Sequence, residues 1–162
     1  MIAEQHLTAL QTLCARLEDG RVTWALTGSL GMALQGVPVA VHDIDIQTDR
    51  DGAYEIERRF SDCVVTPVRY AASERIRSHL GALEIGGVKV EIMGALQKRL
   101  DDGRWEEPVD VARYRCWVEG EGLRVPVLSL VYEYRAYRAL GRNERAEMLR
   151  RWLQHRGRIP PR

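Results

Sequence analysis

The chain has 162 residues, 45% of them hydrophobic and 29% charged, with a formal net charge of +1. These values are ordinary for a globular protein, and no apolar run approaches the about eighteen residues needed to span a bilayer, so we expect no membrane association. The three cysteines, Cys14, Cys63 and Cys116, are far apart and form no CxxC or CxxH motif. We therefore expect reduced thiols in a cytoplasmic protein, and neither a disulfide framework nor a zinc site.

The small net charge hides an asymmetry along the chain. Residues 1–134 hold 15 basic and 21 acidic side chains, whereas residues 135–162 hold 9 basic and 2 acidic ones. Basic residues gathered at one end indicate either a surface that faces an anion or neutralisation of an acidic body within the same molecule. Both explanations remain open at this level.

The spacing of apolar residues predicts alternating helices and strands. In chain order we expect a helix at 3–18, a strand at 22–27, a short helix at 29–35 with Ser29 as its N-cap, a strand at 41–47, a helix at 52–60, a strand at 63–68, a hairpin at 78–93, short strands at 112–120 and 123–128, and helices from 129 onward that end near 154. This order predicts one α/β (α+β) domain over residues 1–162. Its core, at about 20–128, is a mixed β-sheet flanked by helices, followed by C-terminal helices at about 129–155.

Two carboxylates stand one residue apart in the segment "VHDIDIQ". Side chains alternate between the faces of a strand, so Asp43, Asp45 and Gln47 share one face while Ile44 and Ile46 point into the core. Two like charges held this close repel each other, which indicates that a cation neutralises them.

A third carboxylate occupies the matching face of a later strand. In "VKVEIM" the same alternation places Glu91 on the outer face. If the two strands are neighbours, Asp43, Asp45 and Glu91 converge in one acidic cluster. Oxygen ligands of this kind suit Mg²⁺, and a pair of such ions can bridge an attacking hydroxyl and a phosphoryl group.

Gly28 and Ser29 lie where the expected strand at 22–27 meets the short helix. Such a turn presents backbone N–H groups and the positive end of a helix to an anion. Gly28 allows a phosphate to approach the backbone closely, and the Ser29 hydroxyl can donate a hydrogen bond to it.

Other polar residues near this motif have simpler explanations. A second DxD, at Asp49 and Asp51, lies in no alternating apolar segment and predicts a turn before the next helix. His42 is expected to face the opposite side from Asp43, in a core or boundary position. The four tryptophans are interpreted as packing residues rather than as platforms for stacking bases.

The ordered set of Gly28-Ser29, Asp43-Ile44-Asp45 and Glu91 resembles the nucleotidyltransferase superfamily, the polymerase-beta-like fold that includes small antibiotic nucleotidyltransferases. The resemblance covers about residues 22–93, and the tail "SLVYEYRAYRALGRNERAEML" has a similar outline to that of many relatives. It departs from them at Tyr137, where relatives often have a phosphate-binding lysine, with Arg135 and Arg138 nearby.

The resemblance implies transfer of a nucleoside monophosphate from an NTP, with ATP as the expected donor, to a hydroxyl acceptor, with release of pyrophosphate. Asp43 and Asp45 would ligate two Mg²⁺ ions, and Glu91 would complete one site and assist deprotonation of the acceptor. Gly28 and Ser29 would hold the outer phosphates.

The acceptor stays open among a small molecule, a protein side chain and an RNA end, although nucleic acid is not specifically indicated. A homodimer mate or a separate helical protein would be one way to complete the acceptor pocket. The alternative is a catalytically degenerate nucleotide-binding or toxin–antitoxin-type interaction module. The three carboxylates favour the enzyme, whereas the altered tail favours the module.

Overall fold

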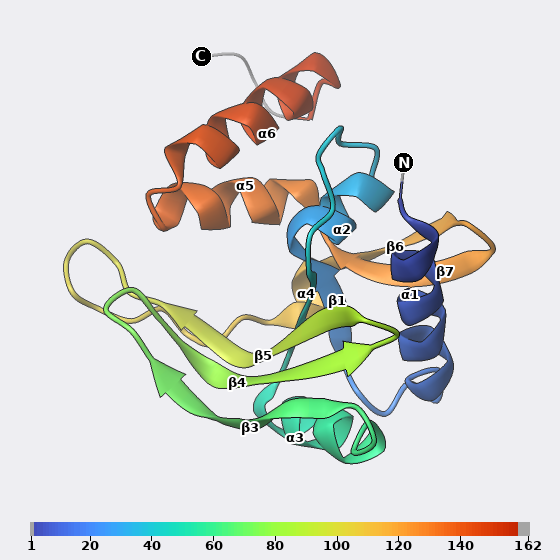
Figure 1. Ribbon diagram of the computed structural model, residues 1–162. Coiled ribbons are helices and arrows are strands. Elements are labelled where there is room, and N and C mark those ends of the chain that lie inside the picture. Colours follow the sequence, from blue (N-terminus) through green and yellow to red (C-terminus); the bar gives the residue numbers. More distant parts are fainter. Residues whose placement is uncertain (1, 159–162) are drawn as a thin grey trace.

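The computed structural model describes residues 2–158. Within this range the chain forms six helices around one seven-stranded sheet (Figure 1). The helices are α1 (Glu4–Arg16), α2 (Gly28–Leu34), α3 (Arg50–Arg59), α4 (Val111–Tyr114), α5 (Leu130–Ala139) and α6 (Asn143–His155). The strands are β1 (Trp24–Thr27), β2 (Ile44–Thr48), β3 (Val64–Ala72), β4 (Ile76–Ile85), β5 (Val88–Lys98), β6 (Arg115–Gly120) and β7 (Leu123–Leu128).

The sheet is mixed, with strand order β3-β4-β5-β2-β1-β7-β6. Hairpins join β3 to β4, β4 to β5 and β6 to β7 in antiparallel fashion, and β1 is antiparallel to β2. The β2–β5 and β1–β7 pairs are parallel. The expected mixed α+β architecture is therefore confirmed, and β2 lies in the centre of the sheet with β5 as its direct neighbour.

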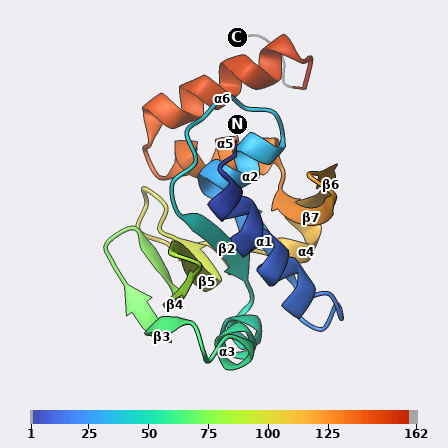
Figure 2. The ribbon, with the colours of Figure 1, turned by 45° about the vertical axis from the view of Figure 1, so that its right-hand side comes forward.

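Helices cover both faces of the sheet. On one face, α1 and α3 bury the largest apolar cluster against the inward side chains of the central strands, among them Ile44, Ile46 and Ile92. On the other face lies α5, and α6 packs against α5 away from the sheet (Figures 1 and 2). A second cluster, which includes Met32 of α2 and Leu149 of α6, joins these helices. The outer face of β2 and β5 is thus enclosed between the sheet and α5.

Most expected elements are present, with three differences that matter for the site. The strand expected from residue 41 begins at Ile44, because the backbone N–H of His42 donates to Ser29 Oγ (3.0 Å) instead of to a neighbouring strand. The short helix begins at Gly28, so Thr27 and not Ser29 is its N-cap residue. The start of the strand expected at 112–120 is instead the single turn α4, which Asp110 caps by accepting a hydrogen bond from the N–H of Arg113.

Two smaller expectations concern the rest of the chain. Asp49 caps α3 by accepting a hydrogen bond from the N–H of Gly52 (2.6 Å), which confirms the turn expected at the second DxD. All three cysteines are free thiols in partly buried positions. Across residues 2–158, none of the helices combines the length and apolar character that crossing a membrane requires.

Candidate functional site

Asp45 and Glu91 are register partners on the parallel strands β2 and β5. Because residues opposite each other in a sheet project to the same face, the two carboxylates stand side by side. Asp45 is half-buried, and the Glu91 side chain retains 33% of its exposure. Lys89 is the nearest cation to Glu91, with Nζ 3.7 Å from Oε2. The alternation of the two strands therefore produces the acidic pair that the sequence indicates.

Asp45 experiences this acidic environment most strongly. Burial, followed by the neighbouring charges of Glu91 and Asp43, raises the pKa of Asp45 to about 7. Arg142 and Lys89 act in the opposite direction but do not compensate. The raised pKa of Asp45 therefore reflects burial first and the two neighbouring carboxylates second.

Gly28 lies directly against Asp45. Thr27 is the register partner of Asp45 across β1 and β2, and the chain turns at Gly28 with φ +70°. A Cβ atom at Gly28 would stand 2.5 Å from Asp45 Oδ2, closer than side chains tolerate. Glycine avoids this overlap and the strain of a positive φ, so the turn between β1 and α2 meets the carboxylate and the two halves of the predicted motif lie together.

Ser29 is buried and has a structural partner. Its Oγ accepts the hydrogen bond from the N–H of His42, which ties α2 to the segment that leads into Asp43. This bond uses an oxygen lone pair and not the hydroxyl proton. His42 itself is exposed, so the core or boundary position expected for it is wrong. Residues 41–43 precede the strand, and of these only Val41 is partly buried against the core.

Asp43 occupies the outer edge of the site. It is exposed and precedes β2, although its charge still acts on Asp45. Among residues 2–158, no group of three or more His, Cys, Asp or Glu side chains is already arranged to hold a metal ion. The structure therefore brings Asp45 and Glu91 together and leaves Asp43 exposed, just ahead of β2.

The donor set nevertheless fits a divalent cation. Carboxylate oxygens are the ligands that Mg²⁺ prefers, and the register pairing of Asp45 with Glu91 presents such oxygens side by side. A cation at this point would lower the pKa of Asp45 and relieve its repulsion from Glu91.

Glu133 of α5 is a site residue that the sequence interpretation missed. It is buried, and its carboxylate accepts hydrogen bonds from the Thr27 hydroxyl and from the N–H of Gly28. Burial is the main cause that raises the pKa of Glu133 to about 7. A signal was available, because position 133 falls on the same helical face as Leu130 and Tyr137, where a carboxylate must have a buried partner.

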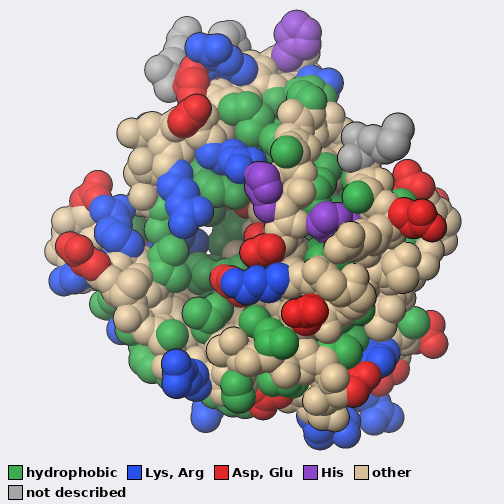
Figure 3. Space-filling model, viewed as in Figure 1, with side chains coloured by type: hydrophobic (Ala, Val, Ile, Leu, Met, Phe, Trp, Pro, Cys, Tyr) green, Lys and Arg blue, Asp and Glu red, His purple; other side chains and the backbone are tan. Residues whose placement is uncertain are grey.

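A cavity of about 270 Å³ lies between α5 and the outer face of the sheet. Asp45, Glu91 and Arg142 line one end of it. Figure 3 shows a hollow on this side of the molecule, with basic side chains gathered along one rim and acidic side chains along the opposite one. Basic groups that can bind an anion and acidic groups that can bind a cation therefore face the same hollow.

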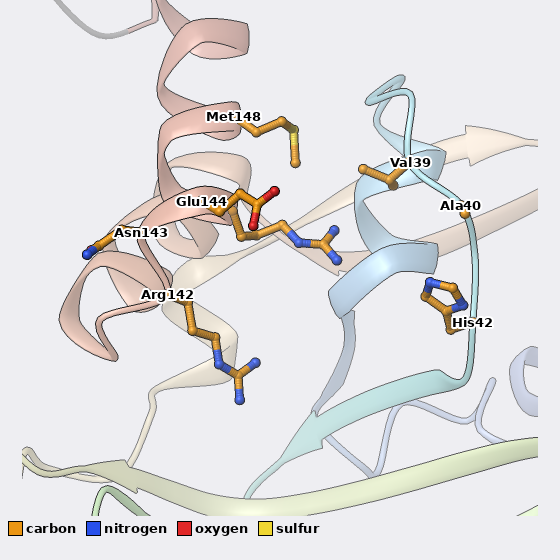
Figure 4. Close-up of a pocket in the computed structure, with 8 residues that line it drawn as sticks. Val39, Ala40, His42, Arg142, Asn143, Glu144 and Met148 are labelled. Carbon is orange, nitrogen blue, oxygen red and sulfur yellow. The ribbon is translucent and has the colours of Figure 1, made fainter.

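A second cavity, of about 560 Å³, opens between the segment 39–42 and the start of α6. Figure 4 shows His42 on one side of it and Arg142 on the other, with the Arg142 side chain extending toward β2. Arg142 lines both cavities. The sequence places Arg135 and Arg138 near Tyr137, but in the structure the guanidinium groups of Arg142 and Arg145 lie 6.0 and 5.8 Å from its ring centre.

Comparison with known proteins agrees with this geometry. The family model of the aminoglycoside-2″-adenylyltransferases matches residues 9–151. Among solved structures, a candidate nucleotidyltransferase from Thermotoga maritima is 57% identical, with a TM-score of 0.84 and 96% of each chain covered. The lincosamide antibiotic adenylyltransferase LnuA, solved with lincomycin bound, is 16% identical, with a TM-score of 0.53 over 82% of this chain and 84% of its own, which shows a shared fold. No curated protein matches the sequence.

Proposed function

Because the chain belongs to the aminoglycoside-2″-adenylyltransferase family, we propose that it is a Mg²⁺-dependent enzyme that transfers AMP from ATP to a hydroxyl acceptor. The observation that carries the proposal is the register pairing of Asp45 with Glu91 directly against the turn at Gly28. An acidic pair beside a glycine turn suits a ligand that combines divalent cations with phosphates.

Asp45, Glu91 and Asp43 would hold the cations. Two bound Mg²⁺ ions supply charge neutralisation at the α-phosphate and activation of the attacking oxygen. Asp45 would be the central ligand of the three, because the charges of Glu91 and Asp43 both act on it. Asp43 is exposed, so it is free to turn toward a ligand at the entrance.

The β- and γ-phosphates would lie at the turn between β1 and α2. The N–H of Gly28 already donates to Glu133, so the N–H groups that follow it, from Ser29 onward, are the donors for phosphate. Arg142 faces this region from the start of α6 and adds a positive charge. A guanidinium group binds phosphate oxygens in a bidentate manner, so it replaces the lysine usual in relatives.

The acceptor would enter the cavity beneath α5, next to Glu91. Its hydroxyl oxygen bonds to the α-phosphorus, the bond from that phosphorus to the oxygen bridging the β-phosphate breaks, and pyrophosphate leaves. Glu91 takes the hydroxyl proton, either directly or through one water. The cavity is about 270 Å³, at the small end of ligand pockets, which favours a small-molecule acceptor over a protein or RNA end.

The decisive experiment compares nucleotide binding by the wild type and by a double variant, Asp43→Asn with Asp45→Asn. Calorimetry and thermal shift with each of the four NTPs, in the presence and absence of Mg²⁺, should show Mg²⁺-dependent binding by the wild type alone. Exposed Asp51 and Asp101 provide the matched control, because their double Asn variant changes the same net charge away from the site. Transfer of labelled nucleotide to candidate acceptors then follows.

If the wild type binds no NTP with Mg²⁺, or binds it as the double variant does, the enzymatic proposal is lost. Mg²⁺-dependent binding without hydrolysis or transfer to any acceptor would instead favour the nucleotide-binding module.

A further inference from the structure

β6 is an edge strand of the sheet, with β7 as its neighbour (Figure 2). An edge strand presents N–H and C=O groups that can pair with a further strand, and proteins usually block such edges. The opposite edge, β3, is blocked in this way, because it contains Pro67 and has two register shifts against β4. β6 contains no proline and pairs with β7 residue by residue from Arg115 to Gly120. The edge of β6 is therefore regular enough to accept another strand.

The turn between β6 and β7 determines which backbone groups of β6 point outward. Glu121 and Gly122 have φ values of +53° and +75°, as in a two-residue type I′ turn. Counted from the pair that closes this turn, hydrogen-bonded and non-hydrogen-bonded pairs alternate along the hairpin. Trp117 and Glu119 fall in non-hydrogen-bonded pairs, and Trp117 lies opposite Pro126, which has no N–H to donate. The N–H and C=O groups of Trp117 and Glu119 therefore point away from β7.

Trp117 is an ordered aromatic residue on the exposed face of β6. It is 44% exposed, and the guanidinium groups of Arg115 and Arg124 lie 5.1 and 4.5 Å from its ring centre. Cation–π contacts of this kind restrict the indole before any partner binds. An aromatic side chain that has little freedom left to lose is a typical anchor of a protein interface.

The sequence of β6 is complementary to a second copy of itself. In an antiparallel pair centred on Trp117, this residue lies opposite Trp117 of the second copy, and Arg115 lies opposite the second copy's Glu119. The three side chains are two residues apart and share one face of the strand. Glu119 is exposed, and within residues 2–158 its carboxylate forms no ion pair. Opposite charges therefore meet at both ends of the paired segment.

The same register pairs the outward backbone groups. The two copies of Trp117 exchange a pair of N–H···O hydrogen bonds, and the N–H of Glu119 donates to the carbonyl of the second copy's Arg115. The N–H of Arg115 already donates to Val111 of α4, so the new ladder ends there. So short a ladder buries less area than a standard interface of about 1,600 Å², and we expect a dimer Kd on the order of 10 µM.

We propose that the free edge of β6 is a homodimer interface, in which two copies of the chain pair antiparallel about Trp117 and join their sheets into one. β7 and β1 separate β6 from β2, so each copy keeps its own site at Asp45 and Glu91. Dimer formation therefore leaves nucleotide binding unchanged.

Sedimentation velocity of the full chain over about 1–200 µM should show a reversible equilibrium between monomer and dimer. Trp117→Thr keeps a residue suited to a strand but removes the aromatic contact, and it should raise the dimer Kd at least about tenfold. Glu119→Lys places a cation opposite Arg115 and should raise the Kd by about the same factor. Two controls should leave the Kd within about twofold. Tyr70→Thr removes an exposed aromatic residue from the other edge strand, and Glu121→Lys makes the same charge change in the turn.

Amide hydrogen exchange locates the contact. Exchange at Trp117 and Glu119 should slow about fivefold between about 2 and 200 µM protein, whereas exchange in β3 should stay constant. A chain that remains a monomer up to the highest concentration overturns the proposal, as does a dimer that protects β3 instead of β6. Circular dichroism shows whether each variant is folded. A dimer whose Kd is unchanged in a folded Trp117→Thr or Glu119→Lys variant also overturns the proposal.

Discussion

Asp45 and Glu91 face each other across neighbouring parallel strands, and the charge of Glu91 makes ionisation of Asp45 less favourable. In the absence of a cation, removal of one charge should therefore stabilise the fold while destroying the site. We expect Glu91→Gln to increase the free energy of unfolding by about 1 kcal/mol at pH 8 without divalent ions. Nucleotide transfer should fall at least a hundredfold. Urea unfolding and a transfer assay measure the two effects.

Glu84→Gln is the matched control, because Glu84 is exposed on β4, outside the cavity. A Glu91→Gln variant that is less stable than the wild type under these conditions would show that Glu91 is a structural residue whose contacts outweigh the repulsion.

Gly28→Ala tests the close approach of the turn to Asp45. Gly28 and Gly20 have nearly the same backbone conformation, with φ +70° and +74°, but a Cβ at Gly20 would meet nothing within 4 Å. Gly20→Ala should therefore cost only the left-handed backbone penalty, about 1 kcal/mol. Gly28→Ala adds the overlap with Asp45 Oδ2, so it should lower the free energy of unfolding by about 2–3 kcal/mol. It should also abolish nucleotide binding.

Denaturant unfolding of both alanine variants measures this difference. Equal losses for the two glycines would mean that Asp45 moves aside at little cost and that the contact does not position it.

The buried carboxylate of Glu133 predicts a pH dependence of stability. Its pKa rises from 4.5 in the unfolded chain to about 7 in the folded one, so the folded protein retains a proton that the unfolded chain releases. The contribution of Glu133 therefore makes the free energy of unfolding fall as pH rises from about 4.5 to 7, by about 3 kcal/mol in total. Glu133→Gln keeps a hydrogen-bond acceptor for Thr27 and removes this component.

Urea unfolding between pH 4.5 and 8 should show that the free energy of unfolding of Glu133→Gln increases relative to that of the wild type as pH rises. Glu4 is exposed at the start of α1, so Glu4→Gln should have the same pH dependence of the free energy of unfolding as the wild type. Parallel curves for Glu133→Gln as well would contradict the raised pKa.

The sequence was sufficient to predict which face Asp45 and Glu91 take, because the two-residue alternation of a strand is local, but it left open whether their strands are neighbours. The Gly86–Gly87 turn fixes the hairpin of β4 and β5, and the apolar residues between the acidic ones fix which face each carboxylate takes. The same rule fails at Lys98. Counted from Glu91, position 98 falls on the core face, but the irregularity near Ala95, with φ +53°, reverses the alternation and brings Lys98 into the cavity.

Residues of the C-terminal helices were not predictable in the same way. Glu133 and Arg142 reach the site because α5 packs on the sheet and the chain turns between α5 and α6. Helical periodicity shows which residues share a face but not which strand that face covers. For this reason the sequence favoured Arg135 and Arg138 as the cations near Tyr137, whereas the structure directs Arg142 and Arg145 there.

This difference between the two sets of arginines gives the final prediction. Arg142 lines both cavities, whereas Arg138 is exposed and donates to the hydroxyl of its helical neighbour Tyr134, with 3.5 Å between Nη1 and the hydroxyl oxygen. Because hydrogen bonds to a charged partner contribute about 1.5–3 kcal/mol, Arg142→Ala should weaken binding of ATP with Mg²⁺ at least tenfold. Arg142→Lys should recover part of this loss, since it restores the charge without the bidentate geometry.

Calorimetry at low and high salt measures both variants, with the larger difference expected at low salt. Arg138→Ala serves as the control and should change the Kd less than twofold; a loss in Arg138→Ala equal to that in Arg142→Ala would assign the effect to the general charge of the C-terminal helices.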